Sequence, residues 1–303
     1  MVRVYSAGSS AIPADSVPTV SGGFREGDYL LGIEGLALLR AGAQRRLDVV
    51  DRRVEEVGTI LAQLGGPSFG ERRDLPEYEV PEGYAGWAGS YDDPGNDTVA
   101  LEEPLVRGLL DELPSGPVLD AACGTGRHAV YLSAAGREVI GVDSSEAMLA
   151  RAREKLPRAD LRGGELENLP LEDGAVAGAV CALALSHLRR LGGAVSELAR
   201  VLRPGGRLVI SNPHPLATGV LGWRAVFVDG QGRRSMIPEY PHSHADYIAA
   251  FVSAGLVVRR LLEPPLTPQQ ARARAKADLG DAFEQALTGL PAVIVWEAER
   301  PRR

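Results

Sequence analysis

VLDAACGTGRHAVYL, residues 118–132, joins a short apolar strand to a helix through a tight turn that contains Gly124 and Gly126. Glycine adopts backbone conformations that other residues avoid, and its missing side chain lets a ligand approach the main chain closely. The first N–H groups of the following helix have no partners inside that helix. The stretch therefore predicts a strand, a turn and a helix with a ligand bound at the turn.

An acidic residue ends the next predicted strand, where a group that binds a ribose is expected. Asp143 lies 17 positions after Gly126 (143 minus 126). A carboxylate at this place accepts hydrogen bonds from the ribose hydroxyls of a nucleotide ligand. Two ligand classes fit this pattern, a nicotinamide or flavin dinucleotide and S-adenosylmethionine.

Asp120, at the end of the first strand, favours one of these two ligands. The pyrophosphate of a dinucleotide would approach this position, and a carboxylate there would repel it. S-adenosylmethionine carries no phosphate, and a carboxylate attracts both its sulfonium and its ammonium group. Electrostatics therefore favours the methyl donor as the ligand.

Short apolar strands alternate with helices from about residue 99 onward. This alternation predicts an α/β fold, a doubly wound, seven-stranded, mostly parallel sheet whose last strand is antiparallel. Ligands of such sheets bind beyond the carboxyl ends of the strands. The predicted strands are 117–121, 138–142, 159–162, 177–183, 206–211, 256–262 and 291–298.

Five segments across residues 80–303 resemble, in order, the motifs of the Rossmann-like S-adenosylmethionine-dependent methyltransferase superfamily. They are VLDAACGTGRHA, VIGVDSSEAML, GGELENLPLEDG, ALALSHL and VLRPGGRLVIS.

The resemblance implies an enzyme that uses S-adenosylmethionine and leaves S-adenosylhomocysteine as the product. The family commonly has Gly-Asp after the third strand, where this chain has Gly164 and Glu165, and Asp before the fourth strand, where it has Ala177.

The resemblance also implies a role for each residue of the donor site. Asp143 would bind the ribose, Glu165 would reach the adenine amino group, and the glycine turn would line the methionine part. A tyrosine before the first strand would close over the donor. The residues expected to bind the cofactor are Tyr91, Asp120, Ala122, Gly124, Gly126, Asp143, Ser144, Met148, Glu165, Leu166 and Ala182.

Two histidines follow neighbouring strands and are the candidate catalytic residues. His187 follows the fourth strand and His214 the fifth, so both should open toward the ligand edge. Histidine suits general-base catalysis near neutral pH, which an acceptor that still carries its proton requires. The alternative is that each histidine only bonds to backbone and shapes the pocket. The spacing of the five histidines does not predict a metal site, so no metal is expected.

Two segments are candidate lids. Residues 212–245 form a long insertion that contains a predicted hairpin around Asp229 and Gly230, with Trp223 and Phe227 as candidate acceptor contacts. Such long excursions at a ligand face commonly have a function, although an edge hairpin without one is the competing interpretation. Residues 66–98 form the second candidate, in which Tyr84 and Tyr91 would close over the donor.

The chain before residue 99 is predicted to be separate from this fold. Residues 1–27 should be a flexible terminus and residues 28–98 a helical extension with a connecting segment, followed by the methyltransferase domain at 99–303. An apolar stripe in the helical extension should pack on the protein's own core or on the preceding segment DYLLGIEGLALL, and pairing in a homodimer is the sharper alternative. The stripe consists of Leu47, Val50, Val54, Val57, Leu61 and Leu64.

Composition limits the partners and the compartment. A net charge of -7 disfavours a phosphate-binding surface, so nucleic acid is excluded and a small-molecule acceptor is expected, with oxygen preferred to nitrogen. The two cysteines and the absence of a long apolar run predict a cytoplasmic protein with no membrane contact. A noncatalytic S-adenosylmethionine-binding protein, a sensor or scaffold, remains the alternative function.

Overall fold

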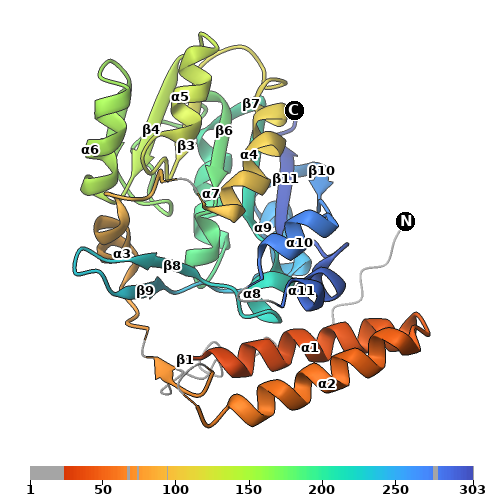
Figure 1. Ribbon diagram of the computed structural model, residues 1–303. Coiled ribbons are helices and arrows are strands. Elements are labelled where there is room, and N and C mark those ends of the chain that lie inside the picture. The colour runs from red at the N-terminus through yellow and green to blue at the C-terminus, as the bar shows by residue number, and fades with distance from the viewer. Residues whose placement is uncertain (1–23, 67–68, 74, 94, 276–278, 303) are drawn as a thin grey trace, which may run out of the picture.

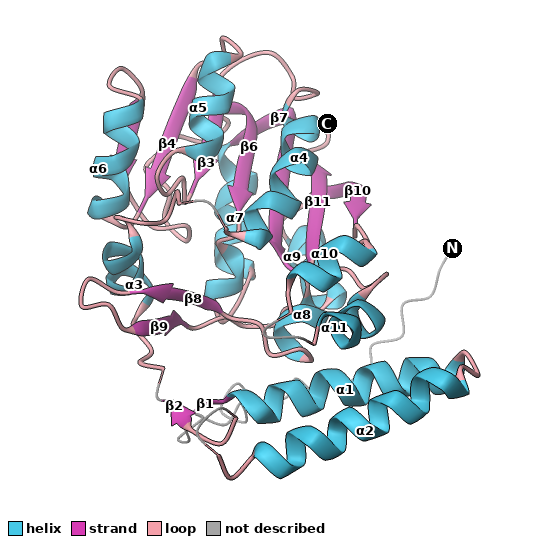
Figure 2. Ribbon diagram, viewed as in Figure 1, coloured by secondary structure: helices cyan, strands magenta, loops and turns pink. Residues whose placement is uncertain are grey.

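The computed structural model describes residues 24–66, 69–73, 75–93, 95–275 and 279–302. A seven-stranded sheet in the order β10-β11-β7-β6-β3-β4-β5 forms its centre. Figure 2 shows the strands of this sheet in magenta, flanked by helices. The strands are β3 (Val118–Ala121), β4 (Val139–Asp143), β5 (Asp160–Gly163), β6 (Val176–Ala182), β7 (Leu202–Pro213), β10 (Val257–Leu262) and β11 (Val293–Glu299).

The pairing within the sheet confirms the predicted fold class. β4 pairs with β3 and β5, and β6 pairs with β3 and β7, all in parallel. β11 is antiparallel to both β7 and β10. Because β11 runs against both neighbours, β7 and β10 are parallel to each other and their carboxyl ends lie at the same edge.

The side-chain alternation of the strands divides the core between the two faces of the sheet. On β3, Leu119 belongs to one buried apolar cluster and Val118 to another, as alternation in a strand requires. The first cluster lies under α7 (Gly192–Val201) and α9 (His244–Ser253). The second lies under α4 (Asp97–Leu110) and α5 (Arg127–Ala134). Both faces are thus covered, which is why the central strands β3 and β6 are almost entirely apolar and buried, whereas the edge strands β5 and β10 carry charged residues.

Helix α3 (Val80–Trp87) and the hairpin of β8 (Ala225–Val228) and β9 (Arg234–Ile237) lie across the carboxyl edge of the parallel strands (Figure 1). The hairpin predicted around Asp229 is therefore present, and its strands pair antiparallel. The segment before α3 joins it, because the Tyr78 N–H donates to the Met236 carbonyl at 3.0 Å. The two candidate lids are thus one connected layer.

The remaining elements connect or extend this core. Of the predicted flexible terminus 1–27, residues 1–23 lie outside the described part, and Phe24–Arg25 form β1, which pairs with β2. The remaining elements are α1 (Glu26–Ala43), α2 (Leu47–Gln63), β2 (Arg72–Arg73), α6 (Glu146–Lys155), the 3-10 helix η2 (Leu185–His187), α8 (Pro215–Gly219), α10 (Pro268–Ala273) and α11 (Gly280–Leu287).

Helices α1 and α2 lie side by side next to the sheet domain, and α1 packs on α11 (Figure 1). The apolar stripe of α2 is only partly packed on the chain. Leu47, Val54 and Leu61 are 72%, 56% and 53% exposed, whereas Val50, Val57 and Leu64 are half-buried. The edge of the stripe formed by Leu47, Val54 and Leu61 therefore faces away from the rest of the described chain.

A different face of α2 is buried because a buried ion pair fixes its rotation. Nη1 of Arg53 lies 3.0 Å from Oε1 of Glu34 on α1, and both side chains are almost fully buried. Val49 and Ile60 are buried on the same helix. Breaking such a pair would leave an uncompensated buried charge, so it holds α2 in this rotation.

Within the described residues, no helix has both the length and the apolar character that crossing a lipid bilayer requires.

Candidate functional site

A cavity of about 370 Å³ opens at the carboxyl ends of β3, β4 and β6, beneath α3. Its volume is in the range of small-molecule sites in proteins. Eight of the eleven residues predicted to bind a cofactor line it, namely Tyr91, Ala122, Gly124, Asp143, Ser144, Glu165, Leu166 and Ala182. The topology thus brings together residues that are far apart in the sequence.

The backbone at the cavity turns through left-handed conformations directly after two strands. Ala122 follows β3 with φ 54° and Leu183 follows β6 with φ 55°, which is unusual for residues with a side chain. Gly124 has φ 55°, and a Cβ added to it would meet no atom within 4 Å. Gly124 therefore leaves its main chain open to a ligand in the cavity.

Asp143 is the central carboxylate of the site. Its Oδ2 accepts the Gly124 N–H at 2.7 Å, and its Oδ1 accepts the Ser145 N–H at 2.8 Å. These bonds join the end of β4 to the glycine turn and fix the carboxylate's orientation. Burial raises the pKa of Asp143, and the two backbone donors act in the opposite direction.

Asp120, Gly126 and Met148 do not line the cavity, although the sequence analysis assigned them to the donor site. Oδ2 of Asp120 instead accepts the Ala129 N–H at 2.8 Å, and burial raises the pKa of this carboxyl to about 6. Gly126 has φ 83° and its Cα faces Ala152 of α6. Met148 is 1% exposed in the core. These three residues support the site without lining the cavity.

A buried carboxylate on α4 fixes the helix that follows the glycine turn. Glu102 accepts hydrogen bonds from Arg127 at 2.8 Å and from Ser211 at 2.7 Å. Nε2 of His128 lies 3.2 Å from the same carboxylate. His128 therefore belongs to this network and does not line the cavity.

The opposite wall of the cavity holds His187 and Tyr84. Nδ1 of His187 lies 2.7 Å from the Pro238 carbonyl, and Nε2 lies 2.8 Å from the Tyr84 hydroxyl. A carbonyl only accepts, so Nδ1 carries the proton, and the Tyr84 O–H donates to Nε2. Burial lowers the pKa of His187 and raises that of Tyr84 well above its ordinary value. Both side chains are therefore uncharged at neutral pH.

An aromatic layer links this wall to the hairpin. Trp87 stacks on Tyr84 with 5.9 Å between ring centroids and on Phe227 with 5.5 Å. Tyr91 meets the edge of Trp87 at 5.0 Å. Phe227 is thus a second-layer support and does not line the cavity, in contrast to the expected acceptor contact. The layer holds α3 over the site.

The other two expected acceptor-side residues, His214 and Trp223, lie elsewhere. His214 does not line the cavity. Its Nε2 lies 2.7 Å from Glu263, and its Nδ1 accepts the Leu216 N–H at 3.1 Å. Trp223 Nε1 donates to the Tyr29 hydroxyl on α1 at 3.1 Å. The fold therefore separates the two candidate catalytic histidines.

Several lining residues were not predicted. Two of them lie in α3, which no motif marks, and the others lie within the quoted motif segments, which do not tell which of their side chains reach the cavity. Proline is common in the first turn of a helix, so the only local indication at Pro81 is that a helix starts there. The missed lining residues are Val80, Pro81, Val142, Ser145, Glu167, Leu183, Ala184 and Leu188.

Comparison with known proteins is consistent with this geometry. Residues 119–210 match the methyltransferase domain family, which spans β3 to β7 and so includes the glycine turn, Asp143 and Glu165. The match covers the half of the site in which most predicted residues meet.

Two relatives match part of the chain. A probable S-adenosylmethionine-dependent methyltransferase of Mycolicibacterium smegmatis is 43% identical over 112 residues, 37% of this chain and 44% of that protein. A malonyl-[acyl-carrier protein] O-methyltransferase of Methylococcus capsulatus is 35% identical over 179 residues, 55% of this chain and 64% of that protein. The chain thus spans less than two thirds of the length of each.

A solved structure shares the fold. The S-adenosylmethionine-dependent methyltransferase of Mesorhizobium loti superposes with a TM-score of 0.51 at 24% identity, over 66% of this chain and 97% of that one. At this identity the similarity concerns the architecture of the sheet and its helices.

Proposed function

We propose that this chain, a member of the Rossmann-like S-adenosylmethionine-dependent methyltransferase superfamily, transfers a methyl group to an oxygen atom of a small molecule. The observation that carries the proposal is the composition of one cavity. Asp143 and Gly124 form one wall, and His187 with Tyr84 forms the other. A donor site and a proton acceptor thus share one enclosed volume.

The residues of the first wall fit S-adenosylmethionine. Asp143, already oriented by two backbone N–H groups, has lone pairs left for the ribose hydroxyls. Gly124 leaves room for the methionine part, and Glu165 at the exposed rim would bind the adenine amino group. Asp120 does not line the cavity and would attract the cationic donor through its charge alone. When bound, the donor supplies an electrophilic methyl group on a sulfonium.

The second wall favours a hydroxyl acceptor. Such an acceptor must lose its proton, and the pair can take it in two linked transfers. The acceptor gives its proton to the Tyr84 oxygen while Tyr84 gives its own to Nε2 of His187, which ends as an imidazolium. A carboxylate acceptor, as in the relatives named malonyl-[acyl-carrier protein] O-methyltransferase, needs no such base.

One observation favours a second candidate, a noncatalytic S-adenosylmethionine-binding protein. Both ring nitrogens of His187 already have partners, so this histidine also fits a purely structural role. The two functions differ in turnover and agree in donor binding.

Calorimetric titration with S-adenosylmethionine and with S-adenosylhomocysteine tests the donor site first. We expect micromolar binding of both, and binding of neither would overturn both functions. A panel of hydroxyl and carboxylate acceptors with labelled donor then tests turnover. Binding without transfer to any acceptor would favour the noncatalytic protein.

The exposed stripe on α2 supports a homodimer. Leu47, Val54 and Leu61 are evenly spaced, so an antiparallel two-fold pairing sets Val54 against its copy and Leu47 against Leu61. Val54→Glu should then yield monomers in light scattering after gel filtration. Val252→Glu, on the exposed Val252 of α9, is the matched control. A monomeric parent protein would contradict the pairing.

A further inference from the structure

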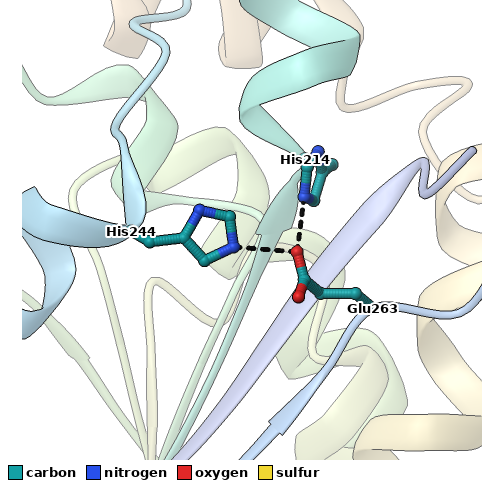
Figure 3. Close-up of side chains that lie close together, drawn as sticks. All are labelled: His214, His244 and Glu263. Carbon is teal, nitrogen blue, oxygen red and sulfur yellow. Dashed lines mark hydrogen bonds and ion pairs between the residues drawn. The ribbon is translucent and has the colours of Figure 1, made fainter.

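We propose that His214, His244 and Glu263 bind one divalent first-row transition-metal cation of the Zn²⁺ class, outside the donor cavity. Figure 3 shows the two imidazole rings and the carboxylate converging on one point. The spacing of the histidines in the sequence gave no indication of this site, because its three residues come from three separate segments.

The topology of the sheet creates the convergence. His214 follows β7 and Glu263 follows β10, two strands whose carboxyl ends lie at the same edge on either side of β11. His244 begins α9. The His244 ring meets the ring of Trp296 on β11 with 6.0 Å between their centroids, so α9 packs on the same side of the sheet as Trp296. Three well-formed elements thus position the three side chains.

The ligand atoms are close enough for a shared cation. Nε2 of His214 lies 2.7 Å and Nε2 of His244 2.8 Å from the same Oε1 of Glu263. The three ligand atoms all lie within 4.8 Å of one another. Metal bonds of about 2.0–2.2 Å to nitrogen and oxygen need only small side-chain rotations to replace these contacts.

The donor set selects the type of metal. Two imidazoles and one carboxylate are a ligand set for Zn²⁺ and related cations, with further positions left for water or a substrate atom. Hard cations such as Mg²⁺ prefer oxygen ligands. The His214 side chain is 8% exposed, whereas Glu263 and His244 are 34% and 40% exposed. One ligand is therefore anchored in the protein, and the other two leave an entry from solvent.

Metal binding should alter the start of α8. Nδ1 of His214 accepts the Leu216 N–H, so without metal the ring carries its proton on Nε2 and donates it to Glu263. A cation on Nε2 moves that proton to Nδ1, where it can no longer accept from Leu216. The side-chain cap of α8 is then lost, while the cation links β7, α9 and β10 more firmly than the hydrogen bonds do.

The test is metal binding by the full chain, purified without a histidine tag and stripped with a chelator. We expect one Zn²⁺ per chain by competition with a chromophoric chelator. Co²⁺ should give the visible absorption of a four- or five-coordinate site, and Zn²⁺ should raise the melting temperature. No stoichiometric binding of either cation would overturn the proposal.

His244→Ala and Glu263→Gln change partly exposed ligands, so both variants should fold. Each should weaken Zn²⁺ binding by at least about tenfold, since even indirect changes around metal ligands cost that much. Glu299→Gln, at a carboxylate that pairs with Arg259 on the neighbouring strand, should bind Zn²⁺ as the parent does. If either ligand variant keeps the parent affinity, the triad is not the site. Donor binding is measured separately, so failure here leaves the proposed function untouched.

Discussion

The two ends of the carboxyl edge of the sheet carry similar residues in different surroundings. At the donor end, His187 follows β6 and faces Tyr84 inside the cavity. At the far end, His214 follows the neighbouring strand β7 and faces Glu263 and His244. A histidine after a parallel strand is therefore not enough to predict a role, because the elements packed over each strand end decide what the ring meets.

Replacement of His187 should give the largest effect and tests the donor end directly. His187→Ala removes the final proton acceptor, so kcat should fall by about 10²–10⁴-fold with a hydroxyl acceptor. Donor affinity should stay close to that of the parent, because the ring lies on the opposite wall. Steady-state kinetics and calorimetry on the same preparation separate the two.

Tyr84→Phe provides the control for that prediction. If the two residues relay one proton, the double variant should lose no more kcat than either single variant. Additive losses would show that they act independently. An unchanged kcat in His187→Ala would show that no base is used, as a carboxylate acceptor allows.

Asp143→Ala should have the next largest effect and separates the two ends. Loss of the two hydrogen bonds that the ribose hydroxyls would donate to this charged carboxylate should weaken donor binding by about 100-fold. Zn²⁺ affinity should not change, because Asp143 lies at the donor end. Asp173→Ala, at a carboxylate that is 79% exposed, is the matched control for calorimetry. Equal donor affinity in the Asp143 and Asp173 variants would contradict the assigned ribose site.

The contrast between the ends also explains what the sequence could predict. Gly124, Asp143 and Glu165 belong to contiguous motifs that fix local turns, so the predicted strands are confirmed in position and most of the residues expected at the donor line one cavity. His214, His244 and Glu263 meet only through the order of β7, β11 and β10. Their proximity depends on tertiary packing that no local pattern records.

The same limit applies outside the sheet. The buried face of α2 is rotated relative to the predicted stripe, because apolar periodicity identified the stripe at Val54 but not the buried pair of Arg53 and Glu34. A charged residue on the buried face of a helix does not contribute to the apolar periodicity, so the pattern cannot reveal that this face is buried. Trp223 likewise looked like an acceptor contact and packs instead near α1, a choice that depends on where the N-terminal helices dock.

Asp120→Asn should reveal a stability cost at the donor end that depends on pH. Burial raises the pKa of Asp120 to about 6, from an ordinary value near 3.8. The folded state then holds its proton more tightly, so this carboxyl lowers stability as pH rises from about 4 to about 6. The variant should be more stable than the parent at pH 7.5, by up to about 3 kcal/mol.

Urea unfolding at several pH values checks this prediction. The stability difference between variant and parent should shrink as pH falls from about 6 to about 4, because the parent's Asp120 then takes up its proton in the folded state, and it should vanish below the unfolded-state pKa near 3.8. Comparing the two proteins at each pH cancels the titration of other groups. A difference that stays constant with pH, or a less stable variant at pH 7.5, would contradict a raised pKa.

Relief of backbone strain should have the smallest effect on stability, and this strain again distinguishes the donor end of the sheet edge from the end that carries His214. Among the described residues that directly follow strands of the main sheet, the non-glycine residues with positive φ are Ala122 and Leu183, both at the cavity. Ala122→Gly removes the cost of about 1–2 kcal/mol that a left-handed backbone imposes on a residue with a side chain. Glycine also raises the conformational entropy of the unfolded chain, which offsets part of this gain. The net gain in the free energy of unfolding should be below about 1 kcal/mol. Ala129→Gly, in the helix that follows, should have the opposite sign, because glycine weakens helices. Destabilisation by both variants would show that the turn at Ala122 is not strained.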